Sequence, residues 1–120
     1  MASFADEFLE AAKMLEDEYM IPAIVNIVFS CELYLKELQI KAGIPVKKIH
    51  SIKELFENLP IEIQNEIEKN ANIRCFNRFI KEIDNAFKEW RYAYQYSPLS
   101  ISLEDSFRLA YALKKQCDSR

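Results

Sequence analysis

The chain contains a single glycine, Gly43, among its 120 residues. Tight hairpin turns and close backbone approaches use glycine, because it adopts positive φ without steric cost. A sheet protein needs several such turns, and a phosphate-binding loop needs several glycines in a short stretch. One glycine therefore leaves almost no room for a sheet and excludes a glycine-rich nucleotide loop.

Apolar residues recur at helical spacing along the whole chain, with capping signals between the segments. The expected helices are residues 4–19 capped by Ser3, Pro22 to about Ala42, a short helix opened by Ser51, Ile61 to about Lys69, Ile73 to about Gln95, and a last helix after Ser102. This pattern predicts an all-α bundle of four main helices, with a short helical excursion at about residues 50–69. We expect one domain over residues 1–120.

The spacing also predicts which faces are buried. The expected inward stripe of the first helix is Phe4, Phe8, Ala12, Leu15 and Tyr19. The second helix is apolar on most sides in its first half, so it should be central. In the fifth helix, the apolar face predicted by the spacing consists of Phe76, Phe79, Ile80, Ile83, Phe87, Trp90 and Tyr94.

Composition excludes several classes of protein. The net charge of −3 disfavours broad binding to nucleic acid through phosphate contacts. Three widely spaced cysteines and one histidine predict no metal site and no cofactor, and suggest free buried thiols in a reducing cytosol. The apolar run at residues 20–31 is too short for a membrane span, and the N-terminus lacks the basic residues of a signal peptide. We therefore expect a cytoplasmic protein without a membrane partner.

Arg91 is the first candidate functional residue. It lies at the edge of the apolar face of the fifth helix, with Gln95 one turn later on the same side. An arginine set among aromatic residues can bind a phosphate with its guanidinium. The alternative is a boundary arginine whose stem is packed and whose head lies in water, which is the commoner role.

Five further candidate residues lie elsewhere in the sequence. His50, the only histidine, could act in proton transfer or simply pack beside the start of the third helix. Glu32 and Lys36 are spaced as a helical ion pair. Asn26 and Ser30 lie in an apolar stretch and must find hydrogen bonds, on a neighbouring helix, a dimer mate or the Arg91 site.

A basic stripe on the fifth helix also needs an explanation. Arg74, Arg78, Lys81 and Lys88 could follow an RNA backbone, but Glu82 and Glu89 border them. The mixture of charges favours an ordinary solvated face.

The chain resembles the HEPN superfamily (higher eukaryotes and prokaryotes nucleotide-binding) over nearly its whole length. Four features carry the resemblance: the segments CELYLKELQIKAG, KIHSIKELFENLP and FKEWRYAYQ, and a final helix after a proline-containing loop. The resemblance implies a helical bundle that usually dimerises. Many members are metal-independent ribonucleases in toxin–antitoxin, abortive-infection or CRISPR settings.

The family motif is Arg-x(4–6)-His, and Arg91 matches its arginine. The histidine does not carry over, because Tyr96, Ser97 and Pro98 occupy its places. Tyrosine, with an ordinary pKa near 10, is a poor substitute for the base that activates the ribose 2′-hydroxyl. If the chain is an active ribonuclease, Glu32 would orient Arg91, and His50 or Tyr96 would transfer the proton.

Three functional hypotheses follow. In the first, the chain is a non-catalytic or weakly active HEPN domain that binds a nucleotide, RNA or a protein partner, such as a nucleotidyltransferase or antitoxin, in a toxin–antitoxin or defence context. In the second, it is an active metal-independent endoribonuclease. In the third, it is a helical scaffold or dimerisation module without a ligand. The missing histidine favours the first, with Arg91, Gln95, Asn26, Ser30 and Lys36 as binding residues, and a homodimer is expected.

Overall fold

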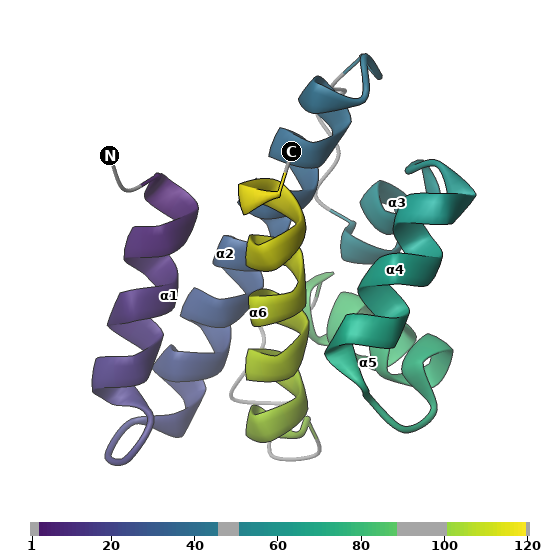
Figure 1. Cartoon of the computed structure of the whole chain (residues 1–120). Coiled ribbons are helices and arrows are strands. Elements are labelled where there is room, and N and C mark those ends of the chain that lie inside the picture. The colour runs from purple at the N-terminus through teal and green to yellow at the C-terminus, as the bar shows by residue number, and fades with distance from the viewer. Residues whose placement is uncertain (1–2, 46–50, 89–100, 120) are drawn as a thin grey trace.

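The computed structural model describes residues 3–45, 51–88 and 101–119, and within these ranges it contains six helices and no strand (Figure 1). The predicted all-α fold is confirmed. The count of four main helices stays a prediction, because residues 89–95, the expected second part of the fifth helix, lie outside the described residues. Trp90 and Tyr94 lie there too.

Helix α1 (Phe4–Leu15) begins where the sequence predicts. The Ser3 hydroxyl accepts a hydrogen bond from the Asp6 N–H at 3.2 Å, and the Asp6 carboxylate accepts one from the Ser3 N–H at 3.3 Å. These bonds form a complete capping box. The helix ends earlier than expected, because residues 16–18 form a turn closed by the Tyr19 N–H on the Leu15 carbonyl at 2.8 Å.

The buried face of α1 differs from the predicted stripe. Ala5, Leu9 and Ala12 are buried, whereas Phe4 and Phe8 are 76% and 36% exposed. The alanines and Leu9 also follow helical spacing, and alanines allow close approach to the neighbouring helix. The prediction is confirmed for Ala12 and wrong for Phe4, Phe8 and Tyr19, because the buried face is centred on Ala5 and Leu9 and leaves these aromatic side chains exposed.

Helix α2 (Met20–Lys41) is central, as its apolar first half predicts. It packs against α1 and α6 (Leu103–Asp118), and more lightly against α3 (Ile52–Glu57) and α5 (Phe76–Lys88) (Figure 1). Its fully buried Ile27, Leu35 and Leu38 anchor the core. Each such side chain contributes about 1.5–3 kcal/mol when removed from water.

The C-terminal end of α2 confirms the stop at Gly43. Gly43 has φ +76°, and its N–H donates to the Ile40 carbonyl at 3.1 Å. The Ile44 N–H reaches back to the Gln39 carbonyl at 2.9 Å. These bonds satisfy carbonyls at the helix end, and the positive φ is the conformation that glycine adopts most easily.

The excursion consists of α3 and α4 (Ile61–Ala71). α4 ends at Asn72, which has φ +51°, and Cys75 has φ +56°. The chain therefore turns over residues 72–75, and α5 begins at Phe76 instead of about Ile73. Within the described part of α5, Phe76, Phe79, Ile80 and Ile83 are buried, as their spacing predicts.

The last helix, α6, packs on α2 and α4 and lies between α1 and α4 in the view of Figure 1. The helix begins after Ser102, as predicted, and the Ser102 hydroxyl caps it by accepting a hydrogen bond from the Asp105 N–H at 3.1 Å. Ala110 and Leu113 are buried, while Leu103 and Phe107 are half-buried.

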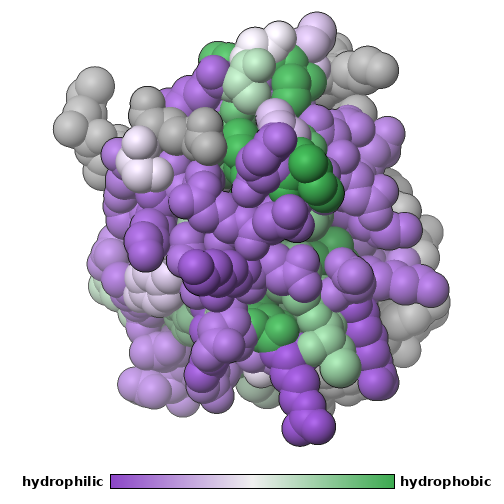
Figure 2. All heavy atoms as spheres, turned by 45° about the vertical axis from the view of Figure 1, so that its right-hand side comes forward, coloured by the Kyte–Doolittle hydropathy of each residue, from purple (hydrophilic) through white to green (hydrophobic). Residues whose placement is uncertain are grey.

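Buried apolar side chains from all six helices form one core cluster. The face turned forward in Figure 2 is mostly hydrophilic, with hydrophobic side chains in separate patches. No helix in the described ranges is long and apolar enough to cross a membrane. The apolar run at residues 20–31 instead forms the first half of the core helix α2, as the sequence predicts.

Candidate functional site

The candidate residues divide between described and undescribed parts of the chain. Glu32, Lys36, Asn26 and Ser30 all lie on α2. Arg91, Gln95, Tyr96 and His50 lie outside the described residues. The structure therefore describes only the α2 side of the predicted site.

Glu32 and Lys36 form the pair that their spacing predicts, with 3.2 Å between Lys36 Nζ and Glu32 Oε2. The pair is less solvated than an ordinary surface pair, because the Glu32 side chain is only 9% exposed and that of Lys36 is 22% exposed. A carboxylate removed from water needs charged or hydrogen-bonding partners. Glu32 therefore has the surroundings of a residue that holds a cationic group in place.

Asn26 and Ser30 satisfy their side chains within α2. The Asn26 amide donates to the Pro22 carbonyl at 2.7 Å, and the Ser30 hydroxyl donates to the Ile27 carbonyl at 2.8 Å. The sequence suggested partners on a neighbouring helix, on a dimer mate or at the Arg91 site. These bonds give each side chain a hydrogen-bond partner within its own helix, so neither residue needs a ligand as a partner.

The start of α3, next to His50 in the sequence, is fixed from α5. The Ser51 hydroxyl donates to Asp84 Oδ1 at 2.7 Å and accepts from the Glu54 N–H at 3.2 Å. The Lys53 N–H also donates to Asp84 Oδ1, at 3.3 Å. Asp84 is 4% exposed. A buried carboxylate thus joins two helices at this point, which spacing within the sequence does not reveal.

A second network, which is partly exposed, joins α1, α2 and α6. The Tyr34 hydroxyl donates to Asp6, and Lys114 Nζ lies 3.5 Å from Asp6 Oδ1. The hydrogen bond from Tyr34 lowers the pKa of Asp6 below its ordinary value, while burial and then Asp6 itself raise the pKa of Tyr34. Tyr34 is therefore a neutral donor and is unsuited to act as a base.

Two clefts were missed because their linings come from separated segments. One, of about 520 Å³, lies between the ends of α1 and α6 and includes Lys13, Phe107 and Tyr111. The other, of about 410 Å³, is lined by Arg74, Cys75, Arg78, Phe79, Glu82, Ser102 and Asp105. The only sequence signal for the second is the basic stripe, and an ion pair of 3.1 Å between Arg78 and Glu82 already neutralises part of it.

The cysteines differ from the expectation in one respect. Cys31 and Cys117 are buried and free, whereas Cys75, also free, is exposed in the turn before α5. Burial raises the pKa of Cys31 to about 12 and raises the pKa of Cys117 as well. Within the described residues, no three His, Cys, Asp or Glu side chains are grouped so that they could hold a metal ion.

Comparison with known families gives one match, and it covers nearly the whole chain. The model of the HEPN domain matches residues 3–115. Neither the comparison with curated proteins nor the one with solved structures finds a match. The family match agrees with the resemblance carried by the segments around Glu32, Ser51 and Arg91. With its all-helical fold and a match from Ser3 to Lys115, the chain belongs to the HEPN domain family.

Proposed function

We propose that this HEPN domain binds RNA or a nucleotide through Arg91 and does not cleave it efficiently. The observation that carries the proposal is the incomplete motif. Arg91 matches the arginine of the family's Arg-x(4–6)-His pattern, but Tyr96, Ser97 and Pro98 fill the three places where the histidine would stand.

The chemistry separates binding from cleavage. A guanidinium stays protonated at all ordinary pH values and presents paired donors to a phosphate, so Arg91 needs no other residue to remain an anion-binding group. Cleavage without a metal needs a base to take the proton from the ribose 2′-hydroxyl. Histidine has a suitable pKa, and tyrosine does not.

Glu32 is the proposed orienting partner of Arg91. Its low exposure and its pairing with Lys36 support this role, since a carboxylate held in a fixed place can align a guanidinium. Lys36 then adds a second positive charge next to the proposed ligand. In this proposal Gln95, four residues after Arg91 in the sequence, contributes a neutral hydrogen-bonding group.

The biological setting proposed here follows from the family. HEPN domains often dimerise, and a homodimer in the cytosol, in a toxin–antitoxin or defence system, is the expected form. A nucleotidyltransferase or an antitoxin is the expected protein partner. The exposed Ile40 and Ile61 support self-association, being 66% and 60% exposed at the end of α2 and the start of α4.

The test compares binding and cleavage in the same variants. Fluorescently labelled single-stranded RNA and ATP serve as probes, with EDTA present. We expect the wild type to bind at least one probe without cleaving RNA, and Arg91→Ala to weaken binding by at least about tenfold. Arg78→Ala, which removes an exposed arginine from α5, is the matched control and should have little effect.

Two outcomes would overturn the proposal. Metal-independent cleavage by the wild type that is lost in Arg91→Ala would make the protein an active ribonuclease. Equal binding by the wild type and Arg91→Ala would favour a scaffold without a ligand at Arg91. The variant Tyr96→His, which restores the Arg-x(4–6)-His spacing, should increase cleavage if the missing histidine is what limits it.

A further inference from the structure

The turn between α1 and α2 exposes an unusual combination of side chains. The segment at residues 14–21, Met-Leu-Glu-Asp-Glu-Tyr-Met-Ile, is called the acidic tip here. Its apolar residues are poorly covered: Met14 is 86% exposed, Tyr19 57%, Met20 37% and Ile21 40%. Four large apolar side chains exposed within eight residues form an apolar surface that the described part of the bundle does not cover.

The charges at this tip are also uncompensated. Glu16, Asp17 and Glu18 are consecutive, and none makes an ion pair or a side-chain hydrogen bond within the described residues. Residues 1–20 carry a net charge of −5, whereas the other 100 residues carry +2. The net negative charge of the protein is therefore concentrated in α1 and in the turn that follows it.

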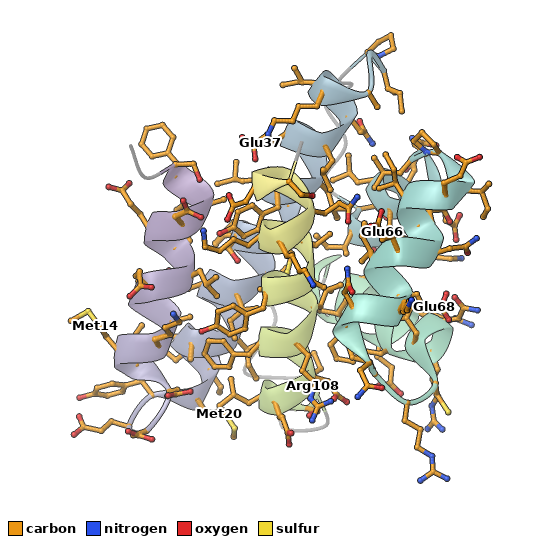
Figure 3. All side chains as sticks on the ribbon, in the orientation of Figure 1. Met14, Met20, Glu37, Glu66, Glu68 and Arg108 are labelled. Atoms are coloured by element: carbon orange, nitrogen blue, oxygen red, sulfur yellow. The ribbon has the colours of Figure 1, made fainter. Side chains whose placement is uncertain are left out.

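The geometry presents these groups outward. The α1–α2 turn lies at the lower left of Figure 1, at one corner of the molecule. In Figure 3, Met14 points away from the bundle and Met20 extends below the start of α2. Methionine side chains are flexible and polarisable, so they adapt to different apolar surfaces.

The charge decides which partner fits. A second copy would bring two acidic tips, each of net charge −3, together across a symmetric contact, which like-charge repulsion disfavours. An anionic membrane surface is repelled for the same reason. A helix with one apolar face and flanking lysines or arginines would cover the methionines and tyrosine and neutralise the carboxylates.

We propose that the acidic tip is the docking site for a cationic amphipathic helix of a partner protein. The apolar face of that helix packs on Met14, Tyr19 and Met20, and its basic residues lie against Glu16, Asp17 and Glu18. No residue of the proposed Arg91 site takes part, so either proposal can fail without the other.

The test uses a labelled helical peptide of leucine and lysine with one apolar face, and a matched peptide with glutamate in place of lysine. Fluorescence anisotropy at about 50 mM salt preserves surface electrostatics. We expect the cationic peptide to bind and the anionic one not to bind. Asp17→Lys/Glu18→Lys should weaken binding by at least about tenfold, and Met14→Ser/Tyr19→Ser by at least about fivefold.

The matched control is Glu62→Lys/Glu68→Lys, which makes the same charge change on exposed residues of α4 (Figure 3 labels Glu68). It should change binding by less than about twofold. Equal loss in both double reversals would show non-specific attraction and overturn the proposal. Binding to vesicles of anionic lipid, or a change in oligomer mass on Met14→Ser/Tyr19→Ser, would assign the tip to a membrane or to a second copy instead.

Discussion

Tyr34 illustrates how a single buried hydroxyl can set the charge state of a surface carboxylate. It is 1% exposed on the central helix, and its hydroxyl donates to Asp6 in the first turn of α1. Asp6 also closes the capping box with Ser3 and faces Lys114 of α6. One carboxylate therefore joins three helices, and its ionised form is the one that all its partners favour.

Removing that hydroxyl should weaken the fold and reduce its sensitivity to acid. Because the pKa of Asp6 is lowered in the folded state, its contribution is complete above the ordinary aspartate pKa and is lost as the pH falls through the lower, folded value. We expect Tyr34→Phe to lower the free energy of unfolding by about 1–2 kcal/mol at pH 7, measured by urea denaturation.

The same comparison at about pH 3 supplies the control, because Tyr34→Phe should cost less there than at pH 7. Glu7→Gln, an exposed neighbour in the same helical turn, should leave both values nearly unchanged. A Tyr34→Phe penalty that does not depend on pH would show that packing, and not the bond to Asp6, gives Tyr34 its importance.

For single residues, the sequence predicts side-chain pairs within one helix better than it predicts which side chains are buried. The Glu32–Lys36 pair follows from spacing alone, because residues four apart always meet on a helix. The shielding of Glu32, the exposure of Phe4 and Phe8, and the exposure of Cys75 depend on which neighbours each helix acquires. Sequence periodicity carries no information about those neighbours.

The helix boundaries that the sequence predicts best are those marked by a serine cap or by the glycine. Ser3, Ser51 and Ser102 each cap the helix that they precede, and α2 ends at Gly43. The turn at residues 72–75 was missed, because Asn72 and Cys75 adopt positive φ without glycine. Asn72 belongs to a type that tolerates this conformation, but Cys75 gives no such signal.

Asp84 joins two helices, as Asp6 joins three, because its carboxylate holds the start of α3 against α5. A helix of six residues cannot persist alone, so its position depends on such contacts. We expect Asp84→Ala to lower the free energy of unfolding by about 1–3 kcal/mol and to speed amide hydrogen exchange in α3, because the Ser51 hydroxyl and the Lys53 N–H lose an acceptor.

Asn85→Ala changes the exposed neighbour of Asp84 and should preserve slow exchange in α3. Ser51→Ala should speed exchange in the same helix as Asp84→Ala does, since it removes the other end of the contact. If Asp84→Ala destabilises the protein without affecting exchange in α3, the carboxylate supports α5 and does not anchor the excursion.

The whole molecule is built around α2, with α1 and α6 covering it. The homodimer is a prediction about the whole molecule, and it is supported by the exposed apolar residues at the end of α2 and the start of α4. We expect light scattering to give twice the chain mass of 14.1 kDa at micromolar concentration. Ile40→Glu/Ile61→Glu should reduce the mass to that of one chain, because it places charges in a contact that needs apolar surface.

Met14→Glu is the matched control, since it introduces the same charge at the acidic tip, and it should leave the mass unchanged. A wild type that is monomeric at this concentration would contradict the dimer. Loss of the dimer in Met14→Glu alone would show that the dimer contact lies at the acidic tip.

The sequence predicts only those parts of the candidate site whose residues lie close together along the chain. The motif around Arg91 and the spacing on α2 are local, so the sequence contains them. The contact between Ser51 and Asp84 and the cleft that joins Arg74 to Asp105 combine residues about 30 apart, and they emerge only when the helices pack. The lengths and the order of the helices determine which of these residues come into contact, and patterns in a single sequence do not encode those contacts directly.

The dependence of α2 on α6 has a consequence during synthesis. The 61 residues between the end of α2 and the start of α6 take about 3–12 s to translate at about 5–20 residues per second. During that interval the face of α2 that α6 later covers has no such cover, although α1 is already available to pack on the other side. The nascent chain is therefore most open to chaperone capture, or to mispairing with another nascent copy, in the seconds before α6 is made.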